Sequence, residues 1–196
     1  MSSRIGFLLL VSVSLASAGC RGLPRSGPSA PPQRFDPASE RAAVYAAVLR
    51  QIVGREGAGR YVVEPMSQEG ESAGADRLRG LRPDTLQAFA EAHSGERLPL
   101  DLDAGGPLDW FSLADWPGLA PESASAQDHW VAFHERFPDA FGRTTLSQVG
   151  FSRDGTQALT WLWHGRASLD SYRMLVLLER RMAGWRVVDT ATTSIS

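Results

Sequence analysis

Two histidines five residues apart, each beside a carboxylate, are the first residues in this sequence that could carry chemistry. His129 follows Asp128, and His134 precedes Glu135. An imidazole next to an acid can transfer protons or bind a metal ion. On a helix, however, this spacing turns the two rings about 140° apart, whereas paired zinc ligands stand four residues apart. The spacing favours histidines of a helix surface, and a hydrolase that uses His134 and Glu135 is the alternative.

Other patterns that mark catalytic or metal sites are incomplete. Asp101 and Asp103 precede two glycines, as in a calcium-binding loop, but Ser112 stands where that loop needs a bidentate Glu. His93 and His164 have no ligand pattern near them. The sequence has no serine elbow, no phosphate-binding glycine loop and no second cysteine. We therefore expect no catalytic residue, no metal and no cofactor, and the sequence favours a protein that is not an enzyme.

The six tryptophans are the remaining chemical resource. Trp110 and Trp116 lie in chain rich in Gly and Pro, while Trp161 and Trp163 alternate onto one face of a predicted strand. Flat amphipathic rings can stack on a sugar or hold a partner protein with little loss of entropy. These four are the candidate ligand-binding aromatics, with an envelope protein or a glycan as the ligand, and core packing is the alternative.

Composition limits the partners further. The chain of 196 residues is 43% hydrophobic, which is enough to bury one core. Lys and Arg together number 20 against 22 Asp and Glu, so the formal net charge is -2. This balance gives no electrostatic reason to expect a nucleic-acid partner.

The elements that must position these residues begin with a helix. Asp36 is placed to cap it and Pro37 to occupy its first position. Apolar residues then recur along one face, and Gly54 ends the helix. Residues 61–64 are β-rich and predict a short strand, which Pro65 ends.

Two further helices are predicted. One opens at Pro83, with Asp84 as its cap and Gln87 in the reciprocal capping position. The other runs from about Ser125, its cap, to Arg136. The chain between these two helices is expected to be irregular.

The C-terminal third has the pattern of a β-meander. Asp154 and Gly155 form a strong hairpin signal, and short connections favour neighbouring antiparallel strands. The expected fold class is therefore α+β, with helices packed over one face of the meander, in a cystatin-like or NTF2-like arrangement. The four predicted β runs are residues 146–151, 156–164, 172–180 and 185–189.

The first twenty residues have the pattern of an export signal. Arg4 precedes an apolar run from Ile5 to Leu15, which is shorter than the roughly 20 residues that span a bilayer. Residues 17–20, Ser-Ala-Gly-Cys, resemble the lipobox of bacterial lipoprotein precursors, although Ser17 stands where that family usually has Leu. The resemblance implies that Cys20 carries the lipid and begins the mature protein.

The same region also contains an alternative signal-peptidase cleavage site. Ala16 and Ala18 form an A-x-A site, and cleavage after Ala18 would release a soluble periplasmic protein. By the lipoprotein resemblance, Arg21 in place of Asp favours the outer membrane in a Gram-negative cell.

The following chain is Pro-rich, cannot build a core and reaches roughly 50 Å if it is extended. The expected divisions are a signal peptide at 1–19, a tether at 20–36 and a single domain at 37–196.

The domain itself resembles an uncharacterised family of bacterial exported proteins. The resemblance rests on residues 149–158, on residues 176–179 and on residues 185–188. It implies no known activity. The sequence therefore predicts a cell-envelope protein, anchored to the membrane through lipid on Cys20, that acts as a non-enzymatic binding module.

Overall fold

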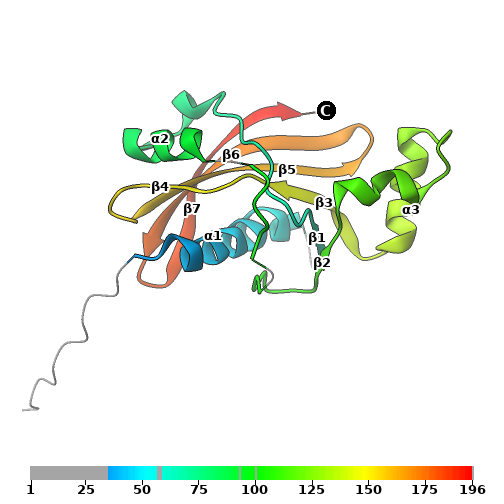
Figure 1. Cartoon of the computed structure of the whole chain (residues 1–196), viewed down its shortest axis with the longest axis horizontal. Helices are drawn as coiled ribbons and strands as arrows, with labels where there is room; N and C mark the ends of the chain where they lie inside the picture. Colours follow the sequence, from blue (N-terminus) through cyan, green and yellow to red (C-terminus); the bar gives the residue numbers. More distant parts are fainter. Residues whose placement is uncertain (1–34, 57–58, 93, 100, 196) are drawn as a thin grey trace, which may run out of the picture. The chain divides into compact units, whose positions relative to one another are not determined.

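The structure, a computed structural model, describes residues 35–56, 59–92, 94–99 and 101–195 (Figure 1). The predicted export signal, Cys20, almost all of the predicted tether and His93 lie outside these residues. Within the described chain, one mixed sheet of seven strands is packed against helices. The predicted α+β class is confirmed.

The sheet combines an antiparallel meander with a parallel extension. The strand order is β2-β1-β3-β5-β6-β7, and β4 pairs with β5. β5, β6 and β7 are antiparallel neighbours, as predicted, whereas β1 is parallel to both β2 and β3. The strands are β1 (Arg60–Val63), β2 (Leu108–Trp110), β3 (Ala140–Leu146), β4 (Gly150–Phe151), β5 (Gln157–Ala167), β6 (Asp170–Arg181) and β7 (Gly184–Ile195).

The first helix, α1 (Pro37–Gln51), begins where the sequence predicts. The Asp36 carboxylate accepts hydrogen bonds from the backbone N–H groups of Ala38 and Ser39, which otherwise have no partner in the first turn. These bonds lower the pKa of Asp36. A row of α1 side chains is completely buried against the sheet, among them Val44, Tyr45, Val48 and Leu49.

The second helix, α2 (Pro83–Glu91), begins without the predicted cap. Arg82 occupies the capping position and no side chain accepts from the first turn. Asp84 lies inside that turn, where its carboxylate instead accepts from the backbone N–H of Arg153. The prediction was wrong because the Asp84 side chain is used by the β4–β5 turn, which no local pattern reveals.

The third helix, α3 (Ala126–Arg136), has the predicted cap. The Ser125 hydroxyl accepts from the Asp128 backbone, and the Asp128 carboxylate accepts from the Ser125 backbone N–H. The described residues also form three short 3-10 helices, η1 (Val53–Glu56), η2 (Ala75–Arg77) and η3 (Leu113–Leu119).

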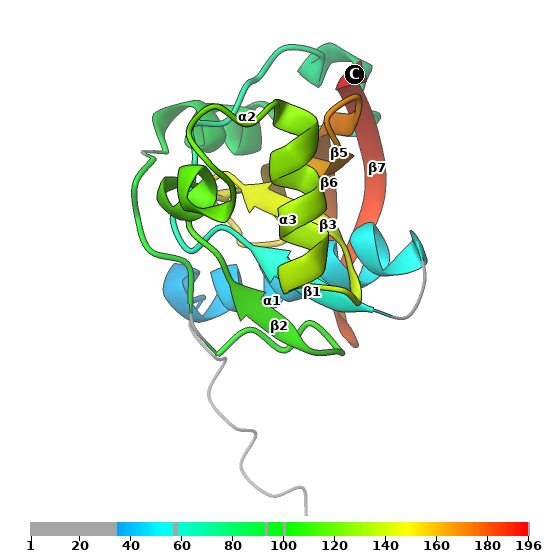
Figure 2. The same ribbon diagram turned by 90° about the vertical axis from the view of Figure 1, so that its right-hand side faces the viewer.

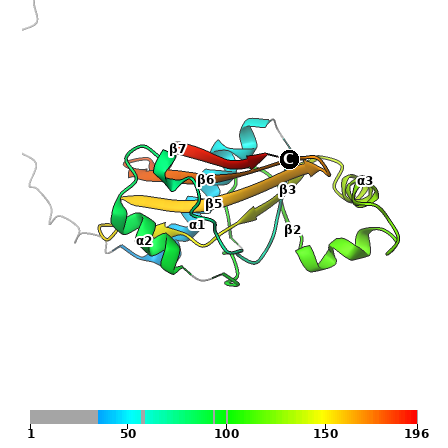
Figure 3. The same cartoon turned by 90° about the horizontal axis from the view of Figure 1, so that it is seen from above.

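Helices cover both faces of the sheet, so the expectation of one covered face is wrong. Figure 2 shows α1 and α2 on opposite sides of the strands. α1 packs over Leu162 of β5 and Val176 of β6, whereas Leu159 and Leu177 of the same strands pack with α2 and η2 on the other face. Because β5 is apolar on both faces, it must be covered twice. α3 covers the β5 end that is far from α2 (Figure 3).

β7 continues to Ile195, well beyond the predicted end at residue 189, and two other strands differ more from the predictions. β3 occupies residues 140–146 rather than beginning at Leu146, and β2 was expected to be irregular chain. β3 contains Gly142 and Arg143, and its pairing with β1 is shifted by an irregularity near these residues. β2 and β3 both pair with β1, which lies far from them in the sequence. The cystatin-like or NTF2-like arrangement stays a prediction.

Candidate functional site

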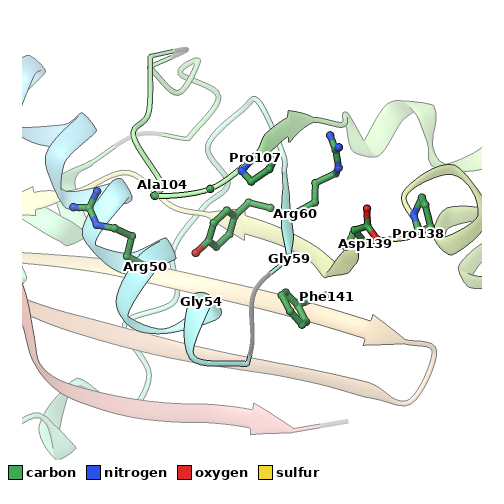
Figure 4. Close-up of a pocket in the computed structure, with 13 residues that line it drawn as sticks. Arg50, Gly54, Gly59, Arg60, Ala104, Pro107, Pro138, Asp139 and Phe141 are labelled. Carbon is green, nitrogen blue, oxygen red and sulfur yellow. The ribbon is translucent and has the colours of Figure 1, made fainter.

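A large pocket of about 860 Å³ lies where β1 and β3 begin (Figure 4). Its walls come from the end of α1 with η1, from the start of β1, from the loop before β2 and from the chain that enters β3. Figure 4 shows Arg50 and Asp139 on opposite sides, with Gly59 and Phe141 between them. The lining residues are Arg50, Gly54, Gly59, Arg60, Tyr61, Ala104, Gly105, Gly106, Pro107, Pro138, Asp139, Ala140 and Phe141.

Two aromatic rings in this pocket rest against glycine backbone. A Cβ on Gly59 would lie 2.4 Å from the Phe141 ring, and a Cβ on Gly54 would lie 2.5 Å from the Tyr61 hydroxyl. Both distances are shorter than any real carbon contact, so glycine is required for the rings to occupy these places. Burial raises the pKa of Tyr61, which keeps its hydroxyl neutral at neutral pH.

Two arginines line the pocket, each beside a carboxylate, and Asp139 adds a negative charge to the lining. Arg60 forms an ion pair with Asp109 of β2, and its side chain is 37% exposed. Arg50 donates to the backbone carbonyl of Asp103, and its charge lies 3.8 Å from the Asp103 carboxylate. Guanidinium groups have more donors than one carboxylate can use. The pocket therefore offers aromatic faces, unused N–H groups and open backbone, which together suit binding of a polar ligand.

The four candidate tryptophans do not share one cleft. Trp110 of β2 is half-buried against the α1 side of the core. Trp161 is 7% exposed and packs on the α2 side. Trp116 of η3 and Trp163 of β5 are half-buried near α3, and both contact the guanidinium of Arg143. Trp163 thus lies beside Trp116 at Arg143 and also packs against the cluster that contains Trp161, and none of the four lines the large pocket.

The histidines of α3 belong to the helix surface, as their spacing indicates. The His129 ring stacks on Trp116, with 6.1 Å between centroids, and its Nδ1 lies 3.0 Å from the Ser125 carbonyl. The His134 Nε2 lies 2.9 Å from the carbonyl oxygen of Arg166. His134 and Glu135 also line a smaller pocket of about 450 Å³.

The loop at residues 101–106 is a turn. The Asp103 carboxylate accepts a hydrogen bond from the backbone N–H of Gly105, which closes the turn around its own chain. Across the described part of the chain, no group of three His, Cys, Asp or Glu side chains is placed to hold a metal ion.

Sequence reasoning missed the large pocket and Arg143. The pocket residues come from four separate segments, and the glycine pairs near residues 54–59 and 104–106 were the only available signal. Nothing near Arg143 in the sequence marks it as buried, because its guanidinium is covered by Trp116 of η3 and Trp163 of β5.

Comparison with known proteins gives no relative. No family model, no curated protein and no solved structure matches the chain. None of the described helices is long and apolar enough to cross a membrane.

Proposed function

We propose that this chain is a cell-envelope protein, anchored through lipid on Cys20, whose folded domain binds an envelope glycan in the large pocket without catalysing a reaction. The anchor is supported by the signal-like residues 1–19, by the lipobox-like residues 17–20 and by the Pro-rich chain that follows. Two or three acyl chains on Cys20 would hold the domain at the membrane. Arg21 favours the outer membrane in a Gram-negative cell.

The observation that carries the binding function is the construction of the pocket. Its volume of about 860 Å³ lies in the usual range of roughly 300 to 1,000 Å³ for small-ligand sites. Tyr61 and Phe141 supply the flat faces on which sugar rings stack. Arg50 and Arg60 supply donors for hydroxyl and carboxylate oxygens. An acidic glycan matches this combination of groups better than an apolar ligand does.

Metabolic labelling with a fatty acid tests the anchor. Wild-type protein should carry the label and enter the detergent phase on partitioning, whereas a Cys20→Ser variant should do neither. An unmodified N-terminus at Gly19, with the protein in the aqueous phase, would instead establish cleavage after Ala18 and a soluble periplasmic protein.

Calorimetric titration with soluble fragments of an acidic envelope glycan tests the pocket, with the Cys20→Ser protein as the unacylated reference. We expect Phe141→Ala and Arg60→Ala each to weaken binding about tenfold or more, which is about 1.4 kcal/mol. Arg153→Ala, which removes an exposed arginine of the β4–β5 turn, is the matched control. Equal affinity in all variants would reject the pocket, and binding of an envelope protein alone would reject the glycan.

A second candidate function is an envelope hydrolase, which is favoured by the pocket that His134 and Glu135 both line. In that reading the His134 ring, oriented by the Arg166 carbonyl, acts as the acid or base. His134→Ala should then abolish turnover of envelope-derived ester or peptide substrates, while His129→Ala should leave it unchanged. Turnover that survives His134→Ala would remove this alternative.

A further inference from the structure

Arg143 of β3 is a buried cation whose hydrogen-bonding groups are largely unused. The residue is 8% exposed, and its Nε and Nη1 atoms are buried with no acceptor. A guanidinium carries five N–H donors, and leaving such donors buried and unpaired costs free energy. This arrangement needs an explanation beyond simple packing.

Two indole rings hold the Arg143 guanidinium. Its central carbon lies 4.9 Å from the centroid of Trp116 and 4.8 Å from the centroid of Trp163. These distances are typical of cation–π contacts, which stabilise the charge but satisfy none of its N–H groups. Trp116 is itself fixed by Trp130 of α3, with 4.9 Å between the ring centroids. The guanidinium is thus oriented by aromatic contacts rather than by an acceptor.

The acid whose charge acts on Arg143 is Glu64, and the two form no ion pair. Glu64, at the end of β1, is 3% exposed, and its carboxylate accepts from the backbone N–H of Leu113. Burial raises the pKa of Glu64 and lowers that of Arg143, while each charge partly offsets the effect on the other. Among the ion pairs of the described residues, none includes Arg143. Its donors therefore remain available to another acceptor.

The segment next to Arg143 lies at the surface. η3, which carries Trp116, has no fully buried residue, and Leu113 at its start is 48% exposed. η3 is therefore held to the core mainly through Trp116, which contacts Phe111, Trp130 and Phe133, and an incoming group reaches the guanidinium from the side of η3.

We propose that Arg143 anchors a second binding site, which takes the carboxylate of a ligand whose flat apolar body lies beside Trp116 and Trp163. A carboxylate matches the planar fork of a guanidinium with two parallel hydrogen bonds. The site is separate from the large pocket, whose lining does not include Arg143. It stands independently of the membrane anchor and of the glycan.

Thermal unfolding in sodium benzoate tests the site, with benzyl alcohol as the neutral analogue and sodium chloride as the salt control. Benzoate should raise the melting temperature of the wild-type protein in a saturable way, because a ligand that binds only the folded state stabilises it. Arg143→Met should weaken benzoate binding at least tenfold, and Arg143→Lys, which keeps the charge but loses the fork, should weaken it less. Arg153→Met, which changes an exposed arginine outside both sites, should bind benzoate as the wild type does.

Equal benzoate shifts in the wild type and Arg143→Met would overturn the proposal, as would a wild-type shift no larger than that of benzyl alcohol. A response to inorganic phosphate without one to benzoate would overturn the carboxylate assignment. If Arg143→Met does not fold, NMR of the wild-type arginine Nε–H signals decides the question. Benzoate should then shift the Arg143 signal and leave that of exposed Arg153 in place, and an unmoved Arg143 signal would reject the site.

Discussion

His164 is a buried base whose environment opposes its protonation. The residue is 1% exposed, and its Nδ1 lies 2.9 Å from the Thr144 hydroxyl. Burial, reinforced by the charge of Arg166, lowers the pKa of His164 to about 4. In the unfolded chain the same ring titrates near pH 6.5. Between these two values the unfolded chain binds more protons than the folded one, so stability is lost as the pH falls through this window.

We therefore expect acid to destabilise the protein through His164 well before most carboxylates titrate. Between pH 7 and pH 5, the free energy of unfolding should fall by about 2 kcal/mol from this residue alone. Urea unfolding at the two pH values, on the wild type and on His164→Gln, measures the effect. The variant keeps a polar side chain but does not titrate, so its stability should change much less. The same loss in both proteins would assign the effect to other groups.

Trp161 is a buried side chain whose replacement should lower the stability of the fold. It packs on Leu175 and Leu177 of β6, and its indole Nε1 is buried without an acceptor. Trp161→Ala should lower the free energy of unfolding by about 3–5 kcal/mol, because it leaves a large cavity. Trp161→Phe should cost much less, since it removes the unsatisfied donor together with part of the ring. Urea unfolding of both variants separates these terms, and a Trp161→Phe variant as unstable as Trp161→Ala would contradict the account.

Among the elements, the edge strand β7 is closed by a side chain of α1. The Gln51 amide nitrogen donates to the Trp185 carbonyl at 3.1 Å, and its oxygen accepts from the Val187 N–H at 3.0 Å. One glutamine thus replaces the neighbouring strand that β7 lacks on this side. Closing an exposed edge in this way also hinders pairing with another chain.

Replacing Gln51 should therefore open the edge of β7. Gln51→Glu keeps the acceptor for Val187 but turns a donor toward Trp185 into a repelling oxygen, and should cost about 1–3 kcal/mol. The control is Gln87→Glu on α2, where the side-chain amide donates to the exposed Glu91 of the same helix. Urea unfolding and light scattering measure stability and self-association. Equal behaviour of the two variants would show that the Gln51 bonds do not protect the edge.

The elements that could be predicted are those whose signals are local. Asp36 and Ser125 cap their helices with their own side chains, and Gly155 permits the hairpin turn with a positive φ. β2 and β3 could not be predicted, because parallel pairing with β1 joins segments far apart in the chain. Asp84 does not cap α2 because its carboxylate accepts from Arg153, which is also far away in the chain.

The candidate sites were predictable only in their aromatic parts. Trp116 and Trp163 were identified by residue type, and the structure places both against Arg143. The role of Arg143 depends on burial by two other elements, which no spacing reveals. Tyr61 and Phe141 line the same pocket, which forms only because β1 and β3 lie side by side.

At the scale of the whole molecule, the place where the folded domain begins is fixed by aromatic contacts. The Phe35 ring packs edge-on against Phe151 of β4, with 5.2 Å between centroids, and Phe151 in turn contacts Trp185 of β7. The Glu40 carboxylate accepts from the Trp185 indole at 2.6 Å and pairs with Arg180. Phe35 is therefore tied to β4 directly and to β7 through Phe151.

This junction can be loosened by one methyl group. Gly155 has a φ of 66°, and a Cβ there would lie 2.3 Å from the Phe35 ring, whereas Gly80 has a φ of 76° with nothing within 4 Å of its Cβ position. Alanine at either place should strain the backbone by about 1–2 kcal/mol, but only Gly155→Ala displaces Phe35. Because an aromatic pair contributes about 0.5–1.5 kcal/mol, trypsin should cut after Arg34 about two- to tenfold faster in Gly155→Ala than in Gly80→Ala. Equal cleavage rates at that bond would mean that Phe35 does not hold the start of the domain in place.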